Sequence, residues 1–465
     1  MTELLGALGN LVSETKEYGR NILRLSEFAE SRELTPEQVT VLRTNEGELV
    51  ALGLKLGADL DGGIRLQASG VVGIARYVEG SKQLIVQVEP KIAEADVFRM
   101  LDAVYGLSPL SSRSVDIPVE KGTPTTLFLD FFLSQLRSFL QRSAFRGYRF
   151  AEVVEPGRIR GRPLVGQYLS GSASRGRAYE MPCRYVEFSP DVFEHQVLAY
   201  GLHVASGLID LLSDPFREPL HARARELARL LPGVTLRRID VRDIDAHRYS
   251  RLTENFRAIH KIARVLIGGY RTTLAPGSRV PFTSFGVNMG ELFEQYVIAL
   301  LRRAFPTNLV YQKPRLSHSV VPFGKTIELD GLLVGKLERA VVECKYKDIS
   351  SQARDDGDEW IGDKIRSADL YQTIAYATHR AVTATSALIV YPAWSAAAPA
   401  VEWGDPTRDF GWVPGGKLPI PCYLVGINLS ADCAALTSAL ASSVSRVVDL
   451  STTSATSSSS SVKAS

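Results

Sequence analysis

Residues 327–334 read IELDGLLV, and residues 341–345 read VVECK. Both stretches have the apolar composition and the length of a β-strand, and a hairpin is the simplest connection across the few residues between them. Side chains alternate along a strand, so Glu343 and Lys345 point to the same face of the sheet. Asp330 on the neighbouring strand can lie beside them. The two stretches therefore predict a sheet that brings two carboxylates and one ammonium group to one spot.

These three side chains have the composition of a site for phosphate chemistry. Mg²⁺ binds in proteins through one or two carboxylates, together with water and phosphate oxygens. It lowers the pKa of a bound water and holds a phosphate for in-line attack. Lys345 is expected to orient or deprotonate that water, or to stabilise negative charge in the transition state. An unpaired carboxylate in an apolar strand costs several kcal/mol, which favours a functional site over a solvent-facing ion pair. The reaction indicated is Mg²⁺-dependent hydrolysis of a phosphodiester.

The same residues resemble the PD-(D/E)XK nuclease motif, with Asp330 and the pair Glu343-x-Lys345 in the matching positions. The resemblance implies that all three residues are catalytic and that the two acids bind Mg²⁺. It also implies a C-terminal nuclease core of α/β type that cleaves DNA.

Two expected helices add residues to this resemblance. Glu294 lies on an amphipathic helix expected over residues 289–305, where such nucleases often carry a further acidic metal-site residue. Gln372 and Tyr376 lie one helical turn apart and resemble the QxxxY element of RecB-like nucleases. Glu291 shares a helix face with Glu294. Simple surface positions remain the alternative for these helix residues.

The chain is expected to be an α/β protein of several domains, because 465 residues exceed one ordinary core. We predict an N-terminal domain that is β-rich in part (residues 1–125), a helical and arginine-rich middle region (126–280), a nuclease domain (281–450) and a disordered Ser/Thr-rich tail (451–465). In the nuclease domain, a helix is expected over residues 367–378 and further strands over residues 387–391 and 422–428.

Local patterns predict individual elements before the nuclease domain. Thr35 and Gln38 have the spacing of a capping box at a helix start. Residues 71–78 and 84–89 flank a polar turn, as in a β-hairpin. Helices are expected over residues 97–105, over 124–145 and, with breaks near Pro215 and Pro232, over 190–275.

Arginines gather after the helix at residues 124–145, namely Arg142, Arg146, Arg149, Arg158, Arg160 and Arg162. Such a cluster can contact DNA phosphates, meet an acidic surface of a partner, or simply face solvent. The sequence leaves these three interpretations open.

Short motifs along most of the chain resemble McrC proteins. In chain order they are VEPKI at residues 88–92, MLDAVY at 100–105, GRIRGR at 157–162, LFEQYV at 292–297 and DLYQTIAYA at 369–377. The likeness covers roughly residues 65–430, and residues 1–60 match no family. Some members carry Asp where this chain has Glu343, and both residues supply a carboxylate.

This resemblance implies the nuclease subunit of a modification-dependent restriction system. Such subunits work with McrB, a AAA+ ring that hydrolyses GTP and recognises methylated DNA. The N-terminal part of this chain would engage the ring and stimulate its hydrolysis, and the C-terminal part would cut DNA. Residues 411–417, GWVPGGK, superficially resemble a P-loop, but Leu418 and Pro419 exclude one. A separate motor is therefore expected.

Composition sets further limits. The net charge is only +3, from 54 Lys and Arg against 51 Asp and Glu, so charge alone indicates little about nucleic acid. The four cysteines are far apart in the sequence, which argues against a disulfide framework or a zinc cluster. The seven histidines have no metal-binding spacing, and His318 is expected in a core or surface role. No signal peptide or membrane span is recognisable, which indicates a cytoplasmic protein.

Two alternatives remain. One is a RecB-like repair nuclease that acts without a GTPase. The other is a catalytically silent module that binds DNA or regulates the motor. A neighbouring gene for a AAA+ GTPase would separate the restriction subunit from the repair nuclease, and a silent module would tolerate Asp330→Ala and Lys345→Ala.

Overall fold

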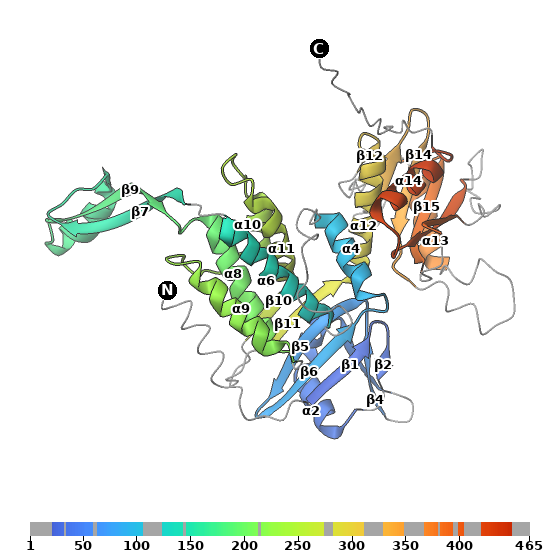
Figure 1. The fold of residues 1–465 in the computed structure, drawn as a ribbon, viewed down its shortest axis with the longest axis horizontal. Coiled ribbons are helices and arrows are strands. Elements are labelled where there is room, and N and C mark those ends of the chain that lie inside the picture. Colours follow the sequence, from blue (N-terminus) through green and yellow to red (C-terminus); the bar gives the residue numbers. More distant parts are fainter. Residues whose placement is uncertain are drawn as a thin grey trace, which may run out of the picture. The chain divides into compact units, whose positions relative to one another are not determined.

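The computed structural model describes residues 21–31, 34–58, 63–105, 123–142, 146–212, 215–273, 282–310, 329–347, 367–379, 382–393, 399–403 and 420–448. The chain forms two compact units, and each unit is built from two separate segments (Figure 1). The first unit comprises Met1–Glu89 and Leu110–Val287, and the second comprises Pro90–Pro109 and Asn288–Ser465. The protein is therefore a multidomain α/β protein, as predicted.

The first unit begins with a β-rich half. Its largest sheet has five strands in the order β1-β6-β5-β11-β10, and a second sheet has the order β2-β4-β3. The strands are β1 (Asn21–Ser26), β2 (Glu30–Ser31), β3 (Leu54–Ala58), β4 (Ile64–Ala68), β5 (Val71–Glu79), β6 (Lys82–Glu89), β10 (Tyr270–Thr273) and β11 (Phe282–Asn288). Strands β5 and β6 pair antiparallel from Gly73↔Val88 to Glu79↔Lys82, which confirms the predicted hairpin.

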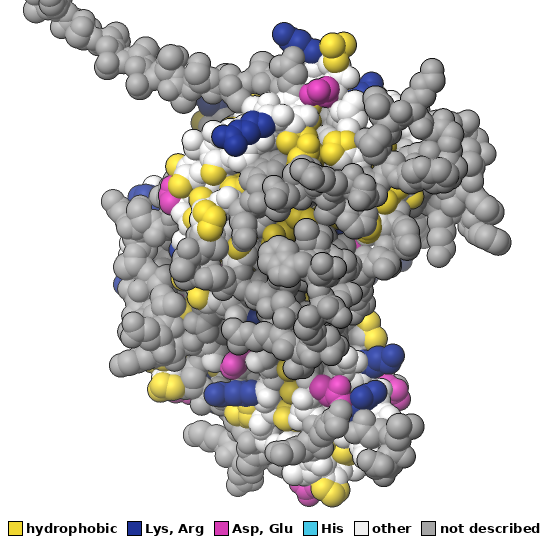
Figure 2. Space-filling view, turned by 90° about the vertical axis from the view of Figure 1, so that its right-hand side faces the viewer, with side chains coloured by type: hydrophobic (Ala, Val, Ile, Leu, Met, Phe, Trp, Pro, Cys, Tyr) yellow, Lys and Arg dark blue, Asp and Glu magenta, His cyan; other side chains and the backbone are white. Residues whose placement is uncertain are grey.

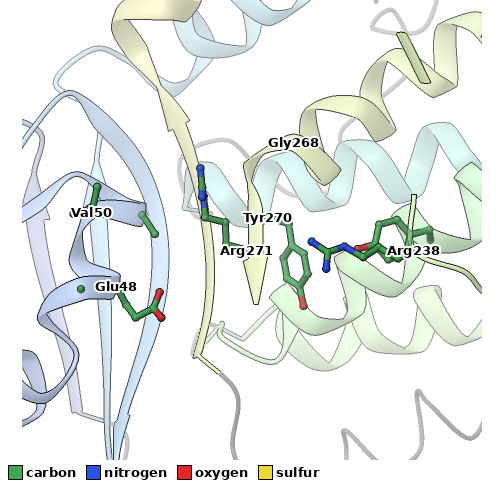
Figure 3. Close-up of a pocket in the computed structure, with 9 residues that line it drawn as sticks. Glu48, Val50, Arg238, Gly268, Tyr270 and Arg271 are labelled. Carbon is green, nitrogen blue, oxygen red and sulfur yellow. The ribbon is translucent and has the colours of Figure 1, made fainter. Parts of the chain in front are cut away.

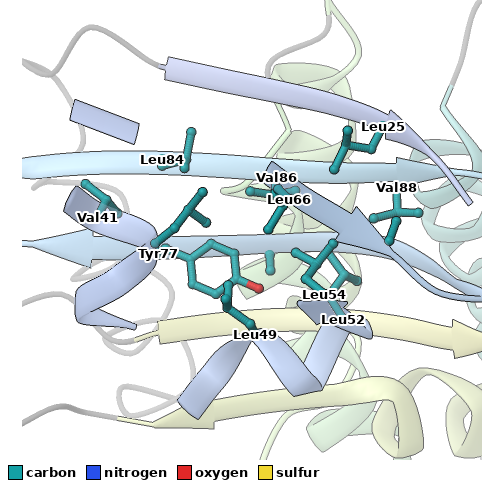
Figure 4. Packing of buried hydrophobic residues seen from close by; sticks show 13 residues of the cluster. Leu25, Val41, Leu49, Leu52, Leu54, Leu66, Tyr77, Leu84, Val86 and Val88 are labelled. Atoms are coloured by element: carbon teal, nitrogen blue, oxygen red, sulfur yellow. The ribbon is translucent and has the colours of Figure 1, made fainter. Parts of the chain in front are cut away.

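A hydrophobic core supports this half of the unit (Figure 4). Tyr77 of β5 and Leu84 and Val86 of β6 are almost fully buried, together with Leu49 and Leu52 from short helical turns. Burial of each such side chain stabilises the fold by about 1.5–3 kcal/mol. The apolar residues of the two predicted strands thus fill this core.

Three short helical elements lie beside these sheets: α2 (Pro36–Thr44), α3 (Glu46–Leu49) and the 3₁₀ turn η1 (Val50–Leu52). Helix α2 begins as predicted. The Thr35 hydroxyl accepts a hydrogen bond from the Gln38 backbone N–H, and the Gln38 side chain accepts one from the Thr35 N–H. The capping box satisfies two backbone donors that the first helical turn leaves open.

The second half of the first unit is a helical bundle. Its helices are α6 (Pro124–Arg142), α8 (Phe193–Ile209), α9 (Arg217–Arg229), α10 (Val241–Ala246) and α11 (Phe256–Gly269). The predicted helix over residues 124–145 and the helical region over 190–275 are confirmed. Helix α6 ends at Arg142, and the last strands of the region, β10 and β11, join the five-stranded sheet instead.

A small sheet interrupts the middle region, where only helices and arginines were predicted. Strands β7 (Gly147–Pro156) and β9 (Glu180–Ser189) run side by side as a narrow antiparallel ribbon (Figure 1), with the two-residue strand β8 (Arg162–Pro163) on the other edge of β9. Short helical turns connect them: α7 (Val165–Gln167), η2 (Tyr168–Ser172) and η3 (Ala173–Arg175). The description of this region as helical is therefore incomplete. The alternating sequence YRFAEVV at residues 148–154 is a strand pattern that the prediction for this region did not include.

The second unit is built on one six-stranded sheet in the order β12-β13-β14-β15-β17-β16. Its strands are β12 (Leu309–Val310), β13 (Gly331–Val334), β14 (Arg339–Cys344), β15 (Ser386–Ala393), β16 (Val401–Trp403) and β17 (Cys422–Asn428). Its helices are α4 (Glu94–Tyr105), α12 (Met289–Ala304), α13 (Ser367–Thr378) and α14 (Cys433–Val444). Strands β14, β15 and β17 are parallel, and the β13–β14 hairpin extends the sheet antiparallel. The predicted helices and strands of this region are all present among the described residues.

Helix α4 belongs to this second unit, although it precedes the middle region in the sequence. Arg303 of α12 donates to the Ala103 carbonyl oxygen at 3.1 Å, and Ser430 donates to Asp96 at 2.9 Å. The predicted domain limits at residues 125 and 280 follow chain order, whereas these contacts join α4 to residues more than a hundred positions later. The N-terminal segment thus contributes one helix to the unit that carries the candidate site.

Three further features concern the cysteines, the hydrophobicity of the helices and the surface charge of the described parts. All four cysteines are free thiols. No helix of the described residues is long and apolar enough to cross a membrane. The face in Figure 2 carries both Lys or Arg and Asp or Glu side chains, in keeping with the near-balanced charge of the sequence. The tail at residues 451–465 lies outside the described residues.

Candidate active site

The β13–β14 hairpin brings the predicted acids together. Gly331 pairs with Val342, so Asp330 lies one step beyond this pair, opposite Glu343. Directly opposed residues of an antiparallel pair have their side chains on the same face. The carboxylate of Asp330 also accepts a hydrogen bond from the Cys344 backbone N–H at 2.8 Å. Asp330 is thereby held against the strand that carries Glu343.

Lys345 completes the group just past the end of β14. Its Nζ donates to Glu343 Oε1 at 2.7 Å and to Gln372 Oε1 at 3.2 Å. Its backbone N–H donates to the Val390 carbonyl oxygen of β15 at 2.8 Å, which holds the position of the chain. The structure therefore brings Asp330, Glu343 and Lys345 to one place on one sheet.

Glu343 is in an unusual electrostatic position. The residue is 3% exposed, and its Oε2 is buried without a hydrogen-bond partner among the described residues. Burial, followed by the negative charge of Asp330, raises the pKa of Glu343 from 4.5 to about 7, although Lys345 acts in the opposite direction. Such an arrangement costs stability unless a cation or a proton joins the two acids.

The acidic neighbours of Lys345 stabilise its charged form. Burial lowers the pKa of Lys345, but the hydrogen bond and charge of Glu343, with the charges of Asp369 and Asp330, outweigh it. The pKa of the ammonium group therefore lies above its ordinary value. Lys345 is held in its charged form.

Helix α13 supplies the two residues of the predicted QxxxY element. Gln372 accepts from Lys345 through Oε1 and donates through Nε2 to the Tyr376 hydroxyl at 2.7 Å. Gln372 thus contacts the site directly, whereas Tyr376 orients the Gln372 amide. The interpretation as an unrelated pair on a helix surface does not account for the contact with Lys345.

Two residues of this cluster, Asp369 and Lys347, were not predicted from the sequence as site residues. Asp369, in the first turn of α13, lies 3.6 Å from Lys345 Nζ and forms an ion pair with Lys347. A sequence signal existed for both: Asp369 stands three positions before Gln372 on the same helix face, and Lys347 follows Lys345 at strand spacing. These contacts make Asp369 a positioning residue for both lysines.

Glu294 lies near Asp330 and Glu343, because the charges of all three act on the Cys344 thiol. It is half-buried on α12, four residues before Ile298, whose Cδ1 would be 2.9 Å from a Cβ atom at Gly331. Its charge contributes to raising the pKa of the Cys344 thiol, mainly after burial and Asp330. Glu291 is exposed on the same helix. Of the two glutamates weighed from the sequence, Glu294 is the one that faces β13 and β14.

The fit to a metal ion rests on the acid pair. No group of three or more His, Cys, Asp and Glu side chains that could hold a metal ion occurs in the described part of the chain. The assignment of Glu294 as a third ligand beside Asp330 and Glu343 stays a prediction. Two adjacent carboxylates, one with a buried oxygen that lacks a donor, fit Mg²⁺, which takes one or two carboxylates and completes its shell with water and phosphate oxygens. His318 and the P-loop-like stretch at residues 411–417 lie outside the described residues.

A comparison with known proteins shows the family of this chain. A family model described as "McrBC 5-methylcytosine restriction system component" matches residues 66–392. The chain belongs to this McrBC family. The resemblance inferred from short motifs is confirmed, and the match spans both the hairpin of the first unit and the β13–β14 hairpin of the second.

One solved structure shows the same fold. One chain of the refined half-complex from the tetradecameric assembly of Thermococcus gammatolerans McrB AAA+ hexamers with bound McrC is similar at 18% identity and a TM-score of 0.52, over 92% of this chain and 100% of that chain. The cryo-EM structure of the Thermococcus gammatolerans McrBC complex is similar at 18% identity and a TM-score of 0.36, over 61% and 88% of the chains. No curated protein sequence matches this McrBC family member.

Proposed function

We propose that this chain is the DNA endonuclease subunit of a McrBC-type restriction system, with a PD-(D/E)XK active site that uses Mg²⁺. The observation that carries the proposal is the convergence of Asp330, Glu343 and Lys345 at the end of one hairpin, with the Gln372 amide against the lysine. The reaction is hydrolysis of a phosphodiester in methylated foreign DNA, in the cytoplasm.

The chain's own residues divide the chemical work. Asp330 and Glu343 would hold the metal ion, which when bound supplies positive charge for activating water and for neutralising the phosphate. Lys345 remains protonated because of its acidic neighbours. Its ammonium group therefore stabilises negative charge on the phosphate and does not act as the base. Gln372 and Asp369 keep the ammonium group aimed at the site.

The proposed partner is a AAA+ GTPase ring. The similar solved chain comes from an assembly of McrB AAA+ hexamers with bound McrC, and this chain has a surface suited to docking. One face of the β7–β9 ribbon exposes apolar side chains: Tyr148 (77%), Phe150 (76%), Val186 (54%), Phe188 (57%) and Val154 (50%). Tyr148 pairs with Phe188 and Phe150 with Val186, so these four side chains form one apolar patch, which the Glu152–Arg184 ion pair separates from Val154. An exposed apolar patch of this kind marks an interaction site.

The arginines of the same ribbon fit a protein partner better than DNA. Arg149 is committed to Glu187 and Asp191, and Arg184 to Glu152. Arg160 lies 3.9 Å over the Tyr185 ring. Because these charges are already neutralised or stacked within the ribbon, fewer of them are free for phosphates. We therefore assign the ribbon to the ring and the DNA to the second unit.

The experiment is a plasmid-cleavage assay with methylated DNA, with and without the cognate AAA+ ring, GTP and Mg²⁺. Wild type should cut only when all three are present. Lys345→Ala should abolish cutting, and Lys336→Ala, an exposed lysine in the turn of the same hairpin, should leave it unchanged. Cutting with Mg²⁺ alone would favour a repair nuclease, and full restriction by Lys345→Ala would favour a silent module.

A further inference from the structure

The first unit contains a cavity that the proposed nuclease function does not use. It has a volume of about 550 Å³ and its polar lining comes from Glu48, Tyr200, Arg238, Tyr270 and Arg271 (Figure 3). These residues belong to four different elements or connections, from α3 near the N-terminus to β10. Ligand pockets in proteins typically measure about 300–1,000 Å³, so the cavity has the size for a small molecule or one nucleotide unit.

The walls of this cavity are packed against one another. Strand β10, which carries Tyr270 and Arg271, pairs with β11. On the other side of β11, a Cβ atom at Gly286 would meet Val71 at 2.9 Å and the Ala51 carbonyl oxygen at 3.4 Å. Strand β10 and the η1 turn that carries Ala51, which both line the cavity, are therefore joined through β11 by close contacts.

Two guanidinium groups in the lining have no acidic partner among the residues that the structure describes. Neither Arg238 nor Arg271 forms an ion pair with a residue that the structure describes, whereas nearby Arg257 and Arg264 are paired with Glu254 and Asp245. Arg238 lies close enough for its charge to act on the Tyr200 hydroxyl, where it lowers the pKa that burial raises.

The lining also has hydrogen-bonding groups of the opposite kind. In Figure 3, Tyr270 lies between Arg271 and Arg238, and Glu48 stands on the other side of Arg271. A carboxylate accepts hydrogen bonds only, whereas a guanidinium donates five. A ligand with an anionic group and a separate hydroxyl or amino donor satisfies both.

We propose that this cavity binds a nucleoside phosphate, with the phosphate on Arg238 and Arg271 and with Glu48 accepting a hydrogen bond from a sugar hydroxyl or a base amino group. Arginine is the side chain best shaped for phosphate oxygens, and Tyr200 and Tyr270 add hydroxyl donors and ring surface. The phosphate ester belongs to a free nucleotide or to the end of a nucleic-acid strand, and both sources present the same chemistry to the cavity.

Calorimetric titration of the full-length protein tests the proposal with three probes: pyrophosphate, guanosine 5′-monophosphate and a short 5′-phosphorylated oligodeoxynucleotide. Arg238→Ala and Arg271→Ala should each weaken binding of the nucleotide or the oligonucleotide about tenfold, or about 1.4 kcal/mol. Arg237→Ala removes the same charge one residue away, outside the lining, and should leave the affinity within about twofold. Glu48→Gln should weaken the nucleotide but not pyrophosphate. Unchanged melting temperatures establish that the variants fold.

Each outcome decides the matter. Binding of the free nucleotide identifies it as the source, and binding of the oligonucleotide alone identifies a strand end. The proposal is overturned if no nucleoside phosphate binds, or if Arg237→Ala weakens binding as much as Arg238→Ala, since general charge attraction would then explain the affinity. The nuclease assay is independent of this result, because none of these residues lies in the second unit.

Discussion

The β13–β14 hairpin and the β7–β9 ribbon both depart from the usual rule that charged side chains are exposed and apolar side chains are buried, but in opposite ways. The β13–β14 hairpin buries charge, since Glu343 is 3% exposed beside Asp330. The β7–β9 ribbon exposes large apolar groups, with Tyr148 and Phe150 each more than three-quarters exposed. Both arrangements cost free energy in the isolated chain, because water favours the carboxylate and disfavours the aromatic rings.

The buried charge of the hairpin and the exposed apolar groups of the ribbon indicate different binding partners. We propose that the hairpin binds a cation together with a phosphate, and that a protein surface covers the rings of Tyr148 and its neighbour Phe188, whose centroids lie 5.2 Å apart. The proposed function supplies both, in DNA cleavage and in the AAA+ ring. Variants that change one sheet should therefore affect one activity and spare the other.

The largest effect is expected at Asp330. Asp330→Asn keeps the shape of the side chain but removes the charge that pairs with Glu343 around a metal ion. DNA cleavage by the reconstituted system should fall about thousandfold or more, which corresponds to about 4 kcal/mol of lost transition-state stabilisation. Stimulation of GTP hydrolysis should remain, because the ribbon is unchanged. Normal cleavage by this variant would contradict the role of the hairpin.

The ribbon should show the complementary result. Replacing Tyr148, Phe150 and Phe188 together by Ser should weaken binding to the ring about hundredfold, since aromatic groups dominate protein interfaces. Stability should hardly change, because all three side chains already face solvent. Binding is measured by size-exclusion or calorimetric titration. Leu337→Ser, at a 92% exposed leucine of the β13–β14 turn, is the matched control and should bind normally. Equal binding by the triple variant and this control would remove the ribbon from the interface.

Stability should reveal the buried charge directly. The folded-state pKa of Glu343, about 7, lies above its ordinary value of 4.5, so protonation favours the folded state. That stabilisation is complete below pH 4.5 and is lost as the pH rises through 7. In EDTA, Glu343→Gln should therefore be more stable than wild type at pH 8 by about 3 kcal/mol, and the advantage should shrink at pH 5. Urea unfolding at both pH values measures it, and an advantage that is the same at both would show that burial of this charge carries no cost.

The smallest effect is expected on α12. Glu294→Gln should lower cleavage about tenfold, because the charge of Glu294 acts on the hairpin at Cys344 together with those of Asp330 and Glu343. Glu291→Gln, one helical turn away and exposed, should have no effect. Rates under single-turnover conditions separate the two. Equal rates for both variants would make Glu294 an ordinary surface residue.

Much of the second unit could be predicted from its sequence. Strand β13 is an apolar run that directly follows Asp330, and β14 is an apolar run that contains Glu343. Their register follows from the short connection, so Asp330 and Glu343 could be placed side by side. The helix spacing of Gln372 and Tyr376 likewise predicted a shared face. Local patterns of this kind are set by strand and helix periodicity.

Other features depend on contacts between distant segments. The pairing of Asp369 with Lys347 and the packing of α4 with α12 join residues that no local pattern relates. The ribbon was missed because its exposed aromatic residues resemble core residues in the sequence and only the fold shows that nothing described covers them. The predicted domain limits could not anticipate units that interleave along the chain.

Divalent-cation binding tests the central claim most directly. Titration of the full-length protein with Mn²⁺, followed by electron paramagnetic resonance, needs neither the ring nor DNA. We expect wild type and Lys345→Ala to bind the ion, with Lys345→Ala unable to cut DNA, and Asp330→Asn to lose the binding. If Asp330→Asn binds Mn²⁺ as tightly as wild type, the acid pair is not a metal site and the account of the nuclease centre is wrong.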